Sequence, residues 1–261
     1  MLELKSVCKV FSPGTVNEKI ALDHIDLTLN PGDFVTVLGS NGAGKSTLLS
    51  TIAGAFRVDA GQILLEGRDI TALPDHKRSK FIGRLFQDPL KGTAPSMTIE
   101  ENLALAYLRA SQGRSPFSRI TKADRQDFRE KLQVLGLGLE DRMEQPVGLL
   151  SGGQRQALTL LMATLVTPKL LLLDEHTAAL DPATAEKVLE LTRSIVAQHG
   201  ITCLMVTHSI PAALSLGNRT ILMDQGRIAL ERSGENRACM TPQQLLEQFH
   251  NAGSDRMVFG A

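Results

Sequence analysis

Apolar and polar positions along the first third of the chain follow a strand-like pattern. Short runs rich in β-branched residues are separated by turns that contain glycine or proline, which is typical of strands. The strands predicted here are 2–11, 20–29, 34–39 and 82–87, with a further strand pair within 61–70 and one helix at 46–56. The first two alternate like antiparallel partners across a turn at 12–19. We therefore expect an antiparallel N-terminal β subdomain.

The pattern becomes helical after residue 87 and then alternates again. Helical periodicity covers 98–111 and 121–136. Beyond it, helices at 154–166, 182–200 and 210–217 alternate with strands at 169–175, 201–208 and 219–226. Such alternation favours a mostly parallel sheet with covering helices. We predict an α/β domain over 1–250, with a core of 1–87 and 155–250, a helical insertion at 88–154, and a C-terminal tail at 251–261.

Composition narrows the possible classes of protein. The chain has 28 basic and 28 acidic side chains among 261 residues, so its net charge does not favour nucleic acid. The basic run at 76–78 is interpreted as a solvated face. Three cysteines, at 8, 203 and 239, lack the spacing of a metal site. The N-terminus has no apolar leader and no apolar stretch reaches membrane-spanning length, so we expect a soluble cytoplasmic protein.

One glycine-rich segment between a predicted strand and a predicted helix indicates phosphate binding. The segment GSNGAGKST matches G-x-x-x-x-G-K-[ST], the P-loop pattern, in the context that pattern requires. Its backbone amides and the helix N-terminus favour an anion, the lysine reaches outer phosphates, and the first hydroxyl suits Mg²⁺. The predicted nucleotide-binding residues are Gly39, Ser40, Asn41, Gly42, Ala43, Gly44, Lys45, Ser46 and Thr47. This predicts a P-loop NTPase with a RecA-like core.

Two adjacent carboxylates end the apolar run LLLLDE. An ionised carboxylate is costly to bury without a partner, so two acids at the end of a buried strand suggest a role with a cation. We predict that Asp174 holds Mg²⁺ and that Glu175 is the general base for water. The predicted reaction is hydrolysis of a phosphoanhydride bond of a nucleoside triphosphate.

The segment LSGGQ at 150–154 adds a resemblance to a known family. Together with GSNGAGKST, LFQDP, LLLLDE, AALD and VTHS, it occurs in the order found in ATP-binding subunits of ABC transporters. The chain resembles that family over nearly its full length. The resemblance implies a head-to-tail dimer, either a homodimer or a pair with a related ATPase subunit. It implies contacts across the dimer from Ser151, Gly152, Gly153, Gln154 and Asp181.

The resemblance also implies roles for three further residues. Gln87 contacts Mg²⁺ and the attacking water, and it belongs with Ser46 and Asp174 to the metal ligands. His208 holds the γ-phosphate and the water. Phe11, at the end of the first predicted strand, stacks on adenine; the competing interpretation is a phenylalanine of the apolar core.

The sequence departs from the family after the catalytic glutamate. Most members have proline there, whereas this chain has His176 in DEHT. One interpretation is that the histidine satisfies the same turn and hydrogen-bonds locally. The alternative hypothesis is that it tunes the protonation of Glu175 near neutral pH. DEHT together with PGTVNEK also resembles an importer-like branch that accompanies amino-acid-type binding proteins.

Two functions are compatible with these motifs. The first is the ATPase subunit of an ABC transporter that couples ATP hydrolysis to transport of a small solute, with import of an amino-acid-like solute preferred. It implies a separate transmembrane permease, an extracytoplasmic solute-binding protein, and a place on the cytoplasmic face of the cell membrane. The alternative is a soluble ABC ATPase with a cytosolic partner, such as a cluster-assembly subunit.

Overall fold

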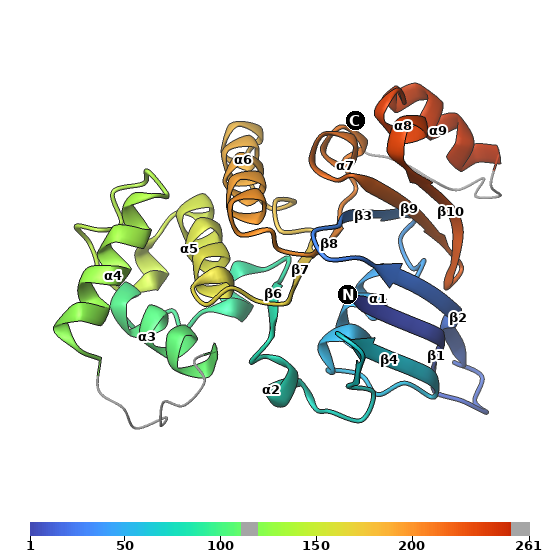
Figure 1. Cartoon of the computed structure of the whole chain (residues 1–261), viewed down its shortest axis with the longest axis horizontal. Coiled ribbons are helices and arrows are strands. Elements are labelled where there is room, and N and C mark those ends of the chain that lie inside the picture. The colour runs from blue at the N-terminus through green and yellow to red at the C-terminus, as the bar shows by residue number, and fades with distance from the viewer. Residues whose placement is uncertain (111–119, 252–261) are drawn as a thin grey trace. The chain divides into compact units, whose positions relative to one another are not determined.

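The computed structural model describes residues 1–110 and 120–251 (Figure 1). The predicted tail at 251–261 therefore lies outside the described residues except for its first position, as does the last residue of the helix predicted at 98–111. The chain divides into two compact units. The first combines Met1–Arg78 with the chain from Gly200 onward, and the second is Ser79–His199.

The first unit contains an antiparallel sheet and a mostly parallel set of strands. Its elements before residue 79 are β1 (Leu2–Phe11), β2 (Lys19–Leu29), β3 (Phe34–Gly39), α1 (Lys45–Ala53), β4 (Ala60–Leu65), β5 (Arg68–Asp69) and α2 (Asp75–Arg78). Its later elements are β8 (Cys203–Val206), α7 (Ile210–Leu216), β9 (Arg219–Asp224), β10 (Arg227–Ser233), α8 (Gly234–Ala238) and α9 (Pro242–Asn251). β1 pairs antiparallel with both β2 and β4, as predicted for the N-terminal subdomain.

Parallel pairing in the first unit centres on β3. It pairs in parallel with β8 on one side and with β9 on the other, while β10 adds to β9 antiparallel. All six residues of β3 are buried, which explains its continuous apolar run. On one face, Leu38 joins an apolar cluster with Leu222 and with Leu245 of α9.

The second unit contains two parallel strands and the helical block. Its elements are β6 (Ile82–Leu85), η1 (Pro89–Gly92), α3 (Ile99–Ala110), α4 (Lys122–Gln133), η2 (Val147–Leu149), α5 (Gly152–Thr164), β7 (Leu170–Asp174) and α6 (Pro182–His199). β6 pairs in parallel with β7, and every residue of β7 is buried. Helices α3, α4 and α5 share a core that includes Leu103, Phe128 and Leu158. No helix among the described residues is both long and apolar enough to cross a membrane.

The α/β prediction is confirmed, but several elements and one side chain were not predicted. The pattern of apolar and polar positions predicted no element at α2, η1, η2, β10, α8 or α9. The solvated-face interpretation of 76–78 is wrong for Arg78, which is 1% exposed. Its guanidinium donates to the carbonyls of Thr51 and Ile52, at 2.9 and 2.7 Å, and so stabilises the last turn of α1. The two units are defined by contacts and do not test the predicted boundaries of core and insertion, which stay a prediction.

Candidate active site

The glycine-rich loop joins β3 to α1 in the first unit. Gly44 precedes α1 in a left-handed conformation, φ +99°, and a Cβ there would collide with the carbonyl oxygen of Ala21. Gly39, at φ +154°, has the same restriction against the carbonyl oxygen of Met223. The loop therefore requires glycine at both ends for steric reasons. Gly42, at φ +85°, and the exposed Asn41 form its middle.

The side chain of Lys45 folds back and contacts the backbone of this loop. Lys45 is 5% exposed, and its Nζ donates to the carbonyl oxygens of Gly39 and Ser40 at 2.9 and 3.0 Å. Ala43 is buried. In the first turn of α1, Ser46 is exposed and Thr47 is half-buried. That turn carries no acidic residue. An ammonium group and a helix N-terminus without nearby acids in the first turn suit a phosphate chain.

His208 lies at the same edge of the sheet as this loop. β3 and β8 pair in parallel with Val37 opposite Val206, so their carboxyl ends point the same way. His208, two residues beyond β8, is exposed. Phe11 is half-buried at the end of β1, and the Phe56 ring meets it edge-on with centroids 5.3 Å apart. The contact leaves both interpretations of Phe11 open.

The second unit places three predicted residues at the carboxyl ends of β6 and β7. These strands are in register from Ile82 with Leu170 to Leu85 with Leu173. Asp174 ends β7 and is 9% exposed, while Glu175 leaves the strand half-buried with φ +46°. Gln87, two residues beyond β6, is exposed at the same edge.

His176 is buried beneath this turn and is 3% exposed. Its Nε2 lies 3.2 Å from Thr192 Oγ1, which donates its own proton to the carbonyl oxygen of Val188 at 2.8 Å. Because that hydroxyl has a single proton, Nε2 is the donor to Thr192. Burial lowers the pKa of His176 to about 4. A pKa that low does not support the hypothesis that His176 tunes the protonation of Glu175 near neutral pH, whereas the hydrogen bond to Thr192 supports the local interpretation.

The LSGGQ segment forms the start of α5. Ser151 caps the helix: Gln154 N donates to its Oγ at 3.2 Å, and the Gln154 side chain accepts from Ser151 N at 3.1 Å. Ser151 and Gly152 are exposed, whereas Gly153 is buried against Thr184, where a Cβ would clash. The exposed serine and glycine leave a helix N-terminus open to a ligand.

Asp181 accepts a backbone hydrogen bond at the start of α6, as Ser151 does at the start of α5. Its Oδ1 accepts from Thr184 N at 3.1 Å. The hydrogen bonds from Thr184 hold the pKa of this carboxyl below its usual value. Asp181 is therefore ionised at neutral pH, and it is exposed.

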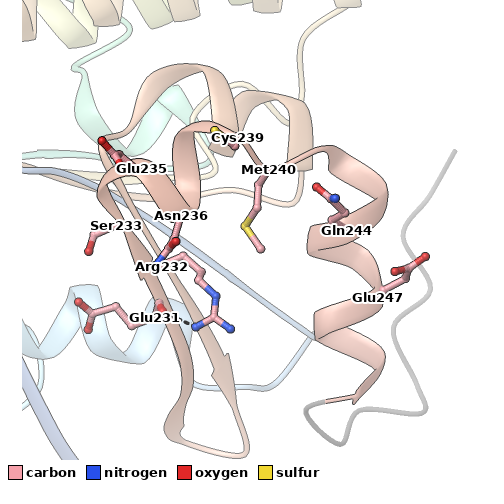
Figure 2. Close-up of a pocket in the computed structure, with 9 residues that line it drawn as sticks. All are labelled: Glu231, Arg232, Ser233, Glu235, Asn236, Cys239, Met240, Gln244 and Glu247. Atoms are coloured by element: carbon pink, nitrogen blue, oxygen red, sulfur yellow. Dashed lines mark hydrogen bonds between the residues drawn. The ribbon is translucent and has the colours of Figure 1, made fainter.

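One pocket of the first unit is separate from these residues. It has a volume of about 820 Å³ and lies among β10, α8 and α9 (Figure 2). Its lining includes Glu231, Glu235 and Glu247 beside Arg232, and none of the predicted site residues. Carboxyl ends of parallel strands, where ligands of α/β sheets bind, instead carry the glycine-rich loop and His208 in the first unit, and Gln87, Asp174 and Glu175 in the second.

Comparison with known proteins identifies the family. Residues 22–178 match the family model described as ABC transporter. The chain is 41% identical over 257 residues to a tyrosine transport ATP-binding protein of Clostridioides difficile, covering 97% of this chain and all of that protein. It is 34% identical over 232 residues to the methionine import ATP-binding protein MetN of Corynebacterium efficiens, of which it spans 61%.

Solved structures agree with these relatives. A dimeric ATP-binding cassette in a post-hydrolysis state, bound to ADP and Pi, matches with a TM-score of 0.78 and 29% identity, over 89% of this chain and 98% of that one. The predicted P-loop fold and ATPase class are confirmed. The chain belongs to the ABC transporter family, as an ATP-binding subunit with ABC-type transport ATPase activity.

Proposed function

We propose that this chain is the motor subunit of an importer for an amino acid of the tyrosine class. The observation that carries the proposal is the 41% identity across the full length of a tyrosine transport ATP-binding protein. Relatives named for methionine and polyamine import support the import direction. None of these names favours the cluster-assembly alternative.

The proposal gives the subunit three partners. A second copy or a related ATPase completes the dimer, because a similar cassette is dimeric and Ser151 and Gly152 are exposed. A separate permease carries the solute, and an extracytoplasmic binding protein delivers it. A similar structure, cbiO1 of Clostridium perfringens, is part of a transporter complex. With these partners, the chain would lie at the cytoplasmic face of the membrane.

The chemistry follows from the groups at the strand ends. Backbone amides of Gly39–Thr47 and the ammonium of Lys45 bind the triphosphate. Glu175 takes a proton from the attacking water, and His208 orients that water against the γ-phosphate. Phe11 stacks on adenine.

The residues present also fit a magnesium ion. Ser46, Gln87 and Asp174 would hold it, since hydroxyl, amide and carboxylate oxygens are ligands that Mg²⁺ prefers. When bound, Mg²⁺ supplies positive charge to the triphosphate. Among the described residues no three His, Cys, Asp or Glu side chains form a metal site of their own.

The dimer contacts complete the proposal. Ser151, Gly152, Gly153 and Gln154 would face the γ-phosphate bound by the partner, with the helix N-terminus favouring its charge. Asp181 would join the two sites.

The test replaces the general base and measures binding, turnover and uptake. Glu175→Gln should keep ATP binding, trap an ATP-bound dimer on size exclusion, and lower ATP turnover about 10²- to 10⁴-fold. Cells that carry only this variant should lose energy-dependent uptake of labelled tyrosine. Glu190→Gln, at an exposed position of α6, is the matched control. Near-full turnover of Glu175→Gln would show that the base is wrong, whereas uptake of tyrosine without this subunit would refute the solute.

A further inference from the structure

Lys19, the first residue of β2, lies beside the glycine-rich loop. In the antiparallel pair of β1 and β2 it stands opposite Phe11. Its ammonium reaches the middle of the loop, because a Cβ built on Gly42 would lie 3.5 Å from Lys19 Nζ. One side chain thus connects the end of β1 with the loop that follows β3.

The ammonium of Lys19 is exposed beside the loop. In the part of the chain that the structure describes, its ammonium forms no ion pair, and the residue is exposed. The neighbouring Glu18 instead accepts from Gly14 N at 2.6 Å. By contrast, Lys9 on β1 is paired with Asp59 at 3.0 Å.

The position of this charge matters because the loop is already positive. Lys45 and the N-terminus of α1 are directed at the same loop, and the first turn of that helix has no acid. A third positive group adds repulsion that an anion relieves. Lysine is a suitable phosphate partner, since its ammonium is a compact point charge on a flexible stem.

We propose that Lys19 is a further nucleotide-binding residue, whose ammonium contacts the phosphate chain of ATP over Gly42. The inference rests on the proposed role of the glycine-rich loop. It adds a contact from the antiparallel subdomain to those from β3 and α1. Phe11 and Lys19, paired across two strands, then hold the base and the phosphates of one nucleotide.

The experiment measures equilibrium binding of fluorescent nucleotides to the purified full chain. The chain has no tryptophan, so MANT-labelled ATP, ADP and adenosine serve as probes. Lys19→Met should raise the Kd for MANT-ATP and MANT-ADP about three- to tenfold, the scale of a solvent-exposed ion pair with a multiply charged partner. The Kd for MANT-adenosine should not change. The loss should shrink at about 0.5 M salt, where exposed charges are screened.

Three controls separate the possible failures. Lys5→Met removes another exposed lysine of the same sheet, paired with Glu3 at 3.4 Å, and should bind like the unmodified chain. Lys19→Arg should retain most of the affinity. Lys45→Met should abolish MANT-ATP binding, and if it does not, the proposed loop itself is wrong. If Lys45→Met fails to bind while Lys19→Met binds like Lys5→Met, or loses adenosine equally, only the inference about Lys19 is overturned.

Discussion

The buried imidazole of His176 should make the stability of the protein depend on pH. Burial lowers its pKa to about 4, against 6.5 for the free side chain. Between these values the unfolded chain binds a proton that the folded chain does not. The stabilisation is therefore fully present above pH 6.5 and is lost as the pH falls toward 4. From the two pKa values, the loss between pH 7 and pH 5 is about 2 kcal/mol.

The substitution His176→Gln isolates this contribution. A glutamine amide can donate to Thr192 Oγ1 as Nε2 does, but it has no proton to gain. Urea unfolding followed by circular dichroism, with EDTA and without nucleotide, gives the free energy of unfolding at both pH values. Carboxylates titrate in both proteins, so the difference between the two proteins in the pH dependence of their free energy of unfolding reports the imidazole. We expect the unmodified chain to lose about 2 kcal/mol more than His176→Gln.

A second histidine provides the control. His199 ends α6 and is exposed, so His199→Gln should follow the unmodified chain at both pH values. If the stability of His176→Gln falls in parallel with that of the unmodified chain, the imidazole is not held neutral by burial. The structural explanation of DEHT would then be wrong.

Two further predictions concern backbone geometry and thiol reactivity. Gly44→Ala should destabilise the protein by about 1–3 kcal/mol and weaken ATP binding, because it adds a clash with the Ala21 carbonyl to a left-handed backbone. Gly138→Ala, at φ +66° with open space around it, should destabilise the protein by only about 1 kcal/mol. Thermal unfolding with and without ATP measures both effects, and a larger destabilisation by Gly138→Ala than by Gly44→Ala would contradict the prediction. Cys239 is exposed, whereas Cys203 is fully buried and burial raises the pKa of its thiol. A thiol reagent should therefore label Cys239 in the native chain and Cys203 only after unfolding, and comparable native rates would contradict this.

Strands that carry the site could be predicted because their signals are local. The segments 34–39 and 170–173 are uncharged runs of strand length, and each is followed at once by glycine-rich or acidic residues. An uncharged run of that length is compatible with a strand buried on both faces. The change in polarity then marks both the end of the strand and the start of the site.

Elements that depend on distant partners could not be predicted in the same way. β10 has only Ile228, Ala229 and Leu230 as apolar residues among charged ones, and its alternating burial arises from pairing with β9. In the sequence, Arg78 is only the last residue of the basic run 76–78, which predicts exposure. Its burial depends on carbonyl oxygens offered by α1, more than twenty residues away along the chain. Nothing near Arg78 in the sequence indicates those acceptors.

The backbone angle φ at Glu175 determines how the neighbouring acids Asp174 and Glu175 are arranged. In a continuing strand, neighbouring side chains point to opposite faces, so two consecutive acids could not serve one edge. The left-handed φ of +46° at Glu175 ends the strand, and Ala178 N then donates to the Glu175 carbonyl at 3.0 Å to form a turn. That conformation is unfavourable for a residue with a Cβ. The buried ring of His176, tied to Thr192, anchors the chain directly after it. The turn thus keeps both acids at the carboxyl end of β7, with Asp174 buried at the strand end and Glu175 half-buried directly after it.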